Sequence, residues 1–290
     1  MAVVNTNIAA SIAQAALARN ERALGKAMEQ LSTGKKINSA SDNAAGLAIS
    51  TRMTSQIRGL DQSIRNAFDA VSMVQTAEGA LDEITAMLQR MRELALQSGS
   101  GTTDASDRSY LNSEFVALRH EIDRISENTE WNGRPILSGN AGASSAGGLS
   151  TVAYQVGMDA AQTITVAFGN FSDATGGKMN ALASKTLSAV SIGSGLKVAS
   201  VVIGQLDLAM TAVSNQRASF GAIQNRLVHA IDNLTNVVTN AEVTRSRIMD
   251  TDYAESTSEL ARTQIIQQAG TAMLAQANQL PATVLQLLQS

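Results

Sequence analysis

The chain has 290 residues, a formal net charge of −3 and an aromatic content of 3%, so its core must be built mainly from aliphatic side chains. The absence of a basic excess, and of any basic stretch interleaved with aromatic residues, argues against nucleic-acid binding. The sequence contains no cysteine, which excludes disulfides, thiolate metal ligands and a thiol nucleophile.

The N-terminal end is uncharged but patterned like a helix. Residues 1–18 contain no Asp, Glu, Lys or Arg, and Leu17, Leu24 and Leu31 recur at seven-residue intervals. Polar spacers such as Gln14 argue against a membrane span, because each buried amide would cost on the order of several kcal/mol in a bilayer. We therefore expect this end to pack on other helices of a protein interior.

The longest periodic segment begins after Asn43 and ends near Ser98, which predicts a single helix of about 80 Å at about 1.5 Å per residue. The main apolar stripe of this helix occupies one heptad position, with Met53, Leu60, Ala67, Val74, Leu81, Leu88 and Ala95. A second apolar stripe beside it is expected from Ile57, Ile64 and Val71.

Two later segments supply partners for this helix. One carries Leu111, Phe115, Leu118, Ile122 and Ile125, and the other carries Leu206, Met210, Val213, Phe220, Leu227, Ile231, Leu234, Val238, Ala241 and Ile248. Between them, Asn132-Gly133 is a turn signal, and two short alternating runs, 152–156 and 164–168, predict a β-hairpin.

The C-terminal end mirrors the N-terminal one. From Thr263 to Ser290 the chain again lacks charged side chains, and Ile266, Met273, Leu280 and Leu287 are spaced by seven. The predicted fold is therefore mainly α: a long antiparallel, coiled-coil-like helical rod with a small β-hairpin insertion and with its N- and C-terminal helices paired.

The sequence offers no catalytic constellation. His120 and His229 are the only histidines and are far apart in the chain, so no paired zinc motif exists. Asp250 and Asp252 form a D-x-D pair that we interpret as a turn or helix cap and not as a cation site. We expect no enzyme activity, no cofactor and no metal.

Two blocks of sequence carry a family resemblance. Residues 29–50, EQLSTGKKINSASDNAAGLAIS, together with the segments 87–94 and 129–134, resemble the N-terminal signature of bacterial flagellin. Residues 245–254, RSRIMDTDYA, and the segment 267–270 are similar to the C-terminal signature of the same family.

The resemblance implies a subunit of the flagellar filament, secreted through the flagellar type III apparatus to an extracellular location. It assigns residues 1–42 and 251–290 to an inner tube domain and residues 43–250 to a rod domain, with a small β-containing insertion at about 130–185. The implied partners are other flagellin subunits, the hook–filament junction and filament cap proteins, and an export chaperone at the C-terminal helices. Neither nucleic acid nor membrane is expected as a partner.

Assembly is expected to depend on the uncharged ends, whose helices gain a complete core from neighbouring subunits. The residues predicted to carry self-assembly are Leu17, Leu24, Leu31, Ile266, Met273, Leu280 and Leu287. An alternative is that these stripes pair only within one chain.

The resemblance also implies recognition by innate immune receptors. Arg90, Leu94 and Glu114 match a site for a Toll-like receptor, although a core residue and a subunit-contact charge pair would account for the same three residues. A peptide detected by plant receptor kinases resembles residues 29–50, which keep Gly34, Asn38, Asp42 and Gly46 but have Asn43 where an acidic residue is common.

Two other functions remain as alternatives at this level. A hook–filament junction protein has similar ends but does not propagate a polymer. An enzyme exported by the same route would need a catalytic motif, such as H-E-x-x-H, that this chain lacks.

Overall fold

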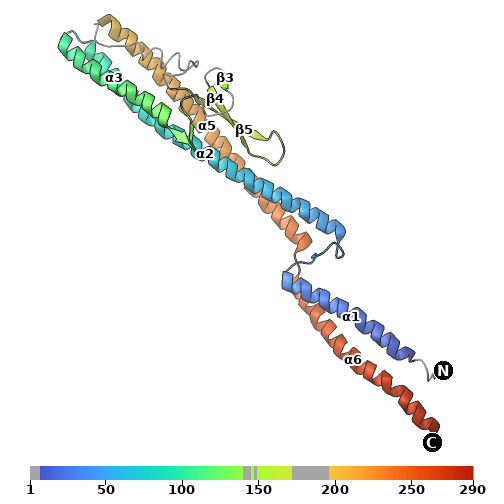
Figure 1. Ribbon diagram of the computed structural model, residues 1–290. Helices are drawn as coiled ribbons and strands as arrows, with labels where there is room; N and C mark the ends of the chain where they lie inside the picture. Colours follow the sequence, from blue (N-terminus) through green and yellow to red (C-terminus); the bar gives the residue numbers. More distant parts are fainter. Residues whose placement is uncertain (1–6, 140–144, 147–148, 172–195, 290) are drawn as a thin grey trace. The chain divides into compact units, whose positions relative to one another are not determined.

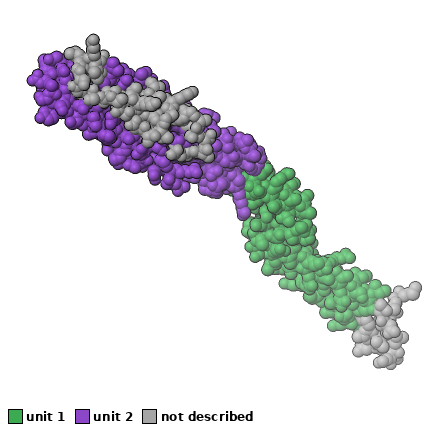
Figure 2. Space-filling model, turned by 45° about the horizontal axis from the view of Figure 1, so that its top comes forward, with its two compact units in different colours: residues 1–57, 239–290 green, residues 58–238 purple. Residues whose placement is uncertain are grey.

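The computed structural model describes residues 7–139, 145–146, 149–171 and 196–289, and at 145–146, 149, 196–200 and 280–289 it describes the backbone only. The chain forms two compact units, one made of residues 1–57 and 239–290 and the other of residues 58–238 (Figure 2).

Long helices dominate both units, which confirms the mainly α fold (Figure 1). The helices are α1 (Ile8–Thr33), α2 (Ala44–Ser98), α3 (Ala105–Asn128), α5 (Leu196–Met249) and α6 (Tyr253–Gln289). The strands are β1 (Glu130–Trp131), β2 (Arg134–Pro135), β3 (Ser145–Ala146), β4 (Leu149–Gln155) and β5 (Thr163–Gly169).

The core of the 58–238 unit follows the predicted main stripe of α2, which is buried from Leu60 to Ala95. Of the predicted second stripe, Ile57 is buried, but Ile64 and Val71 are only half-buried at the edge of the core. The buried positions are instead Ser63, Ala70, Ala77, Ile84, Met91 and Ser98, which alternate with the main stripe at intervals of three and four. Most of these residues are small, so neighbouring elements approach α2 closely without leaving a void.

Helices α3 and α5 close this core as predicted. Phe115 of α3 and Phe220 of α5 are fully buried in the same cluster as the α2 stripe. An ion pair of 2.8 Å between Arg92 of α2 and Asp207 of α5 lies at its edge. A second ion pair, of 3.0 Å between Asp82 and Arg217, shows that α2 and α5 run antiparallel.

The predicted hairpin is present as antiparallel β4 and β5, with Val152 opposite Val166. Its inward face joins the helical core, where the ring of Phe168 lies 5.4 Å from that of Phe220. The predicted Asn-Gly turn connects β1 and β2, and both Asn132 and Gly133 have positive φ angles, 51° and 73°, as a two-residue hairpin turn requires.

In the other unit, α1 and α6 lie side by side, which confirms the pairing of the terminal helices (Figure 1). Helix α1 ends at Gly34, whose φ of 68° is the left-handed conformation that glycine adopts without strain. Beyond it, the Lys36 amide donates to the Met249 carbonyl at 2.7 Å and the Thr251 amide donates to the Gly34 carbonyl at 3.1 Å. These bonds tie the start of the α1–α2 connection to the α5–α6 junction.

Candidate assembly and recognition sites

The contact between α1 and α6 follows a regular seam, which we call the α1–α6 seam. Its members alternate at intervals of three and four residues on both helices, as in a coiled coil, and all are buried or half-buried. They are Ala10, Ala13, Leu17, Asn20, Leu24, Ala27 and Leu31 on α1, and Ser256, Leu260, Thr263, Gln267, Gly270, Leu274 and Ala277 on α6.

A polar layer lies in the middle of this seam. The Asn20 side-chain amide donates to the Thr263 carbonyl at 2.8 Å and to Oε1 of Gln267 at 3.0 Å. Gln267 in turn donates to Glu21 at 3.2 Å. Further along, Asn7 donates to the Ala277 carbonyl at 2.8 Å. Buried polar groups with specific partners fix the register of a helix pair, because a shifted pairing would leave them unsatisfied.

The structure divides the predicted assembly residues into two groups. Leu17, Leu24 and Leu31 are half-buried in the α1–α6 seam, whereas Ile266 and Met273 are exposed, at 40% and 66%. The side chains of Leu280 and Leu287 lie outside the described residues.

Ile266 and Met273 of α6 therefore do not face α1 within one chain. Small and polar residues such as Thr263, Gln267 and Gly270 take that place. A signal for this seam is in the sequence, as a three-and-four spacing of small residues, but the larger side chains one position away dominate a search for apolar stripes.

The exposed Ile266 and Met273 lie on one side of the seam, whereas Ile12 and Ile265, each 65% exposed, lie on the outer faces of their helices. Ile266 and Met273 each precede a seam residue of α6 by one position, as Ala16 and Ala23 do on α1. In an antiparallel pair, the positions on the same flank of both helices adjoin each other, so Ala23 is level with Ile266 and Ala16 with Met273. We call Ala16, Ala23, Ile266 and Met273 the apolar flank.

The opposite flank of the same helix pair is mainly polar. It carries Glu21 on α1, and Gln264 and Thr271 on α6, all exposed, and its one exposed large apolar side chain among the described residues is Met28, at 54%. The two sides of the α1–α6 pair therefore differ in chemistry, and the apolar flank is the one suited to contact with another apolar surface.

Asp42 organises the connection between α1 and α2. Its carboxylate pairs with Lys26 at 3.0 Å and accepts hydrogen bonds from the amides of Asn38 and Ser39 at 3.2 and 3.1 Å. The bond to Lys26 first, and then the two amides, lower the pKa of Asp42 from 3.8 to about 2. Asn43, which departs from the common acidic residue, caps α2 by accepting from the Gly46 amide at 2.8 Å.

The two glycines of the same connection have structural roles. Gly34 ends α1 in a left-handed conformation, and a Cβ on Gly46 would lie 2.6 Å from Cδ1 of the buried Ile37. Asn38 also donates from its side chain to the Lys35 carbonyl at 3.2 Å. Thus Gly34, Asn38, Asp42 and Gly46 each shape one turn of the chain.

The three residues of the predicted Toll-like receptor site lie close together on α2 and α3. Arg90 forms ion pairs with Glu114 at 2.9 Å and with Glu93 at 3.0 Å, and the hydrogen bonds that it donates to these two carboxylates raise the pKa of Arg90 above its usual value. Leu94 is 1% exposed and belongs to the core. Arg90 and Glu114 are accessible, whereas Leu94 supports the surface from beneath.

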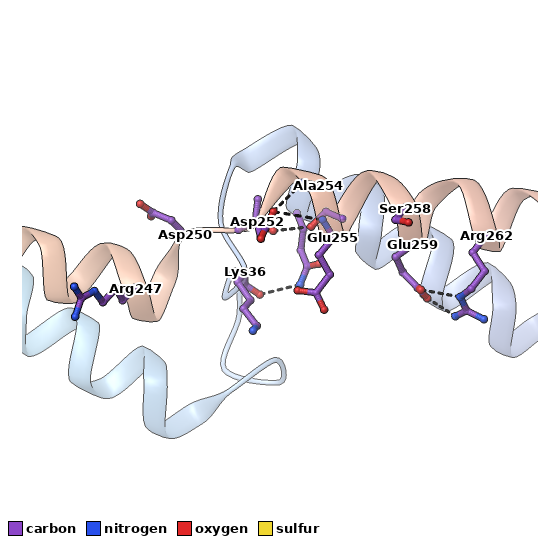
Figure 3. A pocket seen from close by; sticks show the side chains of 12 residues that line it. Lys36, Arg247, Asp250, Asp252, Ala254, Glu255, Ser258, Glu259 and Arg262 are labelled. Carbon is purple, nitrogen blue, oxygen red and sulfur yellow. Dashed lines mark hydrogen bonds and ion pairs between the residues drawn. The ribbon is translucent and has the colours of Figure 1, made fainter.

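A groove of about 900 Å³ runs along the α5–α6 junction (Figure 3). Two of its acidic residues have partners: Glu259 pairs with Arg262, and Asp252 caps α6 by accepting from the Ala254 amide at 2.8 Å, as the interpretation of the D-x-D pair predicted. Among the residues that the structure describes, no cluster of three or more His, Cys, Asp or Glu side chains is placed to hold a metal ion.

Comparisons with known proteins agree with this architecture. Residues 4–142 match the model of the bacterial flagellin N-terminal helical region, and residues 203–288 match that of the C-terminal helical region. The chain belongs to the bacterial flagellin family. Flagellin from Halalkalibacterium halodurans is 44% identical, with 99% of this chain and 100% of that one covered. Flagellin A from Vibrio cholerae serotype O1 is 38% identical, with 99% of each chain covered.

This flagellin is a short form and a structural subunit of the bacterial flagellar filament, not an enzyme. A solved structure of a putative flagellar hook-associated protein from Vibrio parahaemolyticus has the same fold, with a TM-score of 0.60 at 14% identity, covering 72% of this chain and 100% of that one. Within the described part of the chain, no helix combines the length and apolar character needed to cross a membrane.

Proposed function

We propose that the paired helices α1 and α6 form the inner tube of the filament, and that the apolar flank is the surface through which neighbouring subunits pack there. The supporting observation is that Ile266 and Met273 are exposed on a helix with no charged residue after Arg262. Exposure of an uncharged apolar stripe to water is unfavourable in free energy. Burying the stripe against another copy of the chain removes this cost.

The lack of charge has its own role in this proposal. Many copies of the same helix lie close together in a tube, so charged side chains on the buried flank would repel their counterparts or lose hydration. In the same proposal, residues 1–42 and 251–290 form the tube domain and residues 43–250 form the surrounding rod, with its β-containing insertion at about 130–185.

Seeded filament growth tests the proposal. Met273→Glu should reduce growth on short filament seeds at least tenfold, because it places a charge in the apolar flank. Gln264→Glu adds the same charge on the polar flank of the same helix and should leave growth nearly unchanged. Equal growth of both variants, observed by electron microscopy, would show that the flank is not the contact. Seeds that the unmodified chain caps without extending would instead indicate a hook–filament junction protein.

We further propose that the free subunit is a ligand of a Toll-like receptor through Arg90 and Glu114, with Leu94 holding the two helices in place. The supporting observation is that the two charged residues, from different helices, form one exposed pair. Arg90→Ala should lower receptor activation in a reporter cell assay, whereas Arg124→Ala, which removes another exposed ion pair of α3, should not. Equal responses to the two variants would contradict the proposal.

The remaining partners are proposed from family membership. They are the filament cap and junction proteins, an export chaperone that binds the C-terminal helices, and a plant receptor kinase that detects residues 29–50. Secretion through the flagellar type III apparatus places the subunit outside the cell. A synthetic peptide of residues 29–50, compared with one carrying Gly46→Leu, tests the plant receptor through its oxidative burst in leaf tissue.

A further inference from the structure

We propose that Met273 is an oxidation site that controls assembly: conversion of its thioether to the sulfoxide by peroxide blocks addition of the free subunit to the filament. This inference rests on the proposed role of the apolar flank. The chain has no cysteine, so methionine sulfur is its main target for mild two-electron oxidants.

Exposure selects a small number of methionines. Among the described residues, Met28, Met158 and Met273 are exposed, at 54%, 42% and 66%, whereas Met73 and Met91 are buried in the α2 core. Methionine oxidation follows accessibility, so the three exposed residues should react first and Met273 should be among the fastest.

Position distinguishes Met273 from the other two. Met28 follows the seam residue Ala27 and lies on the other flank of α1, and Met158 lies in the turn between β4 and β5, near Gly59 of α2. Only Met273, of these three, belongs to the apolar flank. Oxidation at the other two sites should therefore change accessible surface without changing the proposed contact.

The chemistry is balanced with peroxide as the oxidant. The sulfur lone pair attacks one peroxide oxygen, the O–O bond breaks, an S–O bond forms, and proton transfer releases water. Sulfur is oxidised to the sulfoxide and peroxide is reduced to water. The product carries a strongly polar S–O group. Burying such a group without a hydrogen-bond donor costs free energy, so oxidation lowers the affinity of the contact between subunits.

The free subunit is the sensitive state. In the filament the proposed contact covers Met273, so subunits that have already been added are protected. The switch would therefore act on subunits between export and addition, and methionine sulfoxide reductases would reverse it, with one enzyme needed for each sulfoxide epimer.

The test compares the unmodified chain, Met273→Leu and Met28→Leu, because leucine nearly conserves the volume of methionine. Each soluble chain is treated briefly with hydrogen peroxide, the oxidised methionines are identified by mass spectrometry, and growth on untreated seeds is measured. We expect at least a tenfold loss of growth for the unmodified chain and for Met28→Leu, and less than a twofold loss for Met273→Leu. Treatment with both reductases should restore growth.

Equal inhibition of Met273→Leu, or filaments that incorporate subunits carrying Met273 sulfoxide at the normal rate, would overturn the inference. Met273→Gln serves as an uncharged polar substitute that needs no oxidant, and normal growth of this variant would also overturn it. Should Met273→Glu block growth while oxidation does not, the proposed contact stands and only the oxidation site fails.

Discussion

Asp42 gives the connection between α1 and α2 a defined response to acid. The pKa of Asp42 is lowered from 3.8 to about 2, so its ionised form stabilises the folded connection fully at pH values above 3.8. This contribution to stability is lost as the pH falls through about 2. Amide hydrogen exchange of Asn38 and Ser39 should therefore remain protected at pH 4 and become fast near pH 2, relative to intrinsic rates.

Two variants make this prediction specific to Asp42. Asp42→Asn should lose most of the protection already at neutral pH, because the pair with Lys26 disappears. Asp232→Asn, at an exposed position of α5, should leave exchange at Asn38 and Ser39 unchanged. Protection that is the same in all three chains would mean that other bonds hold the turn.

Two leucines of α2 lie only two residues apart in the sequence but differ greatly in burial. Leu94 is 1% exposed and Leu96 is 51% exposed. We expect Leu94→Ala to lower the free energy of unfolding by about 2–5 kcal/mol and Leu96→Ala by less than about 1 kcal/mol, as urea denaturation would show. Similar losses at both sites would contradict the assignment of Leu94 to the core.

The same residue shows what the sequence can and cannot establish. A core role was the alternative interpretation of Leu94 at the level of the sequence, and the structure places this residue in the core. The sequence alone did not establish that Arg90 and Glu114 form an ion pair within one chain, because it does not specify how α3 folds back onto α2 in space. Only the packing of α3 brings these two charges within 2.9 Å.

At the scale of helices, two glycines should respond in opposite ways to the same substitution. A Cβ on Gly79 of α2 meets nothing within 4 Å, whereas a Cβ on Gly270 of α6 would lie 2.7 Å from Cδ2 of Leu17. Gly79→Ala should therefore raise the free energy of unfolding by about 0.5–1 kcal/mol, since alanine favours the helix. Thermal unfolding monitored by circular dichroism measures this gain.

Gly270→Ala should instead loosen the α1–α6 pair, because Leu17 must move away from the seam. Hydrogen exchange in α1 around Leu17 should become faster in this variant and remain unchanged in Gly79→Ala. Slower exchange in Gly270→Ala would show that Leu17 repacks without loss and that the helix preference of alanine dominates at both sites.

The helices themselves were largely predictable, and their faces were less so. The start of α2 after Asn43 and its end at Ser98 follow from periodicity bounded by turn residues, and the β4–β5 hairpin follows from strict alternation. Which stripe faces which partner was harder, because Ala70 and Ala77 pack as tightly as leucines when a neighbour comes close. Size alone favoured Ile64 and Val71, which lie on the edge.

At the scale of the whole molecule, we expect the 58–238 unit to fold without the end of α6, and the terminal helices to be needed for assembly. Among the residues whose side chains are described, the core cluster around Phe115, Phe168 and Phe220 contains none from α1 or α6. A chain that lacks residues 266–290 should therefore keep a cooperative thermal transition of that core, while α1 loses Gln267, Gly270 and Ala277 as seam partners. The N-terminal part of α1, from Ile8 to about Leu17, loses its seam partners and should therefore unfold, whereas the rest of α1 keeps its contacts with Ser256, Leu260 and Thr263.

The truncated chain should then fail to extend filament seeds although most of it remains folded. Circular dichroism would show helix loss confined to about the removed segment and the N-terminal part of α1, and electron microscopy would show seeds of unchanged length. Because Met273→Glu alters only one side chain of the same surface, the two experiments together distinguish loss of the helix pair from loss of its contact. Undiminished growth of the truncated chain would mean that α6 beyond Ile265, with its flank residues Ile266 and Met273, is not needed for assembly, and that subunits associate through the remaining residues 1–265.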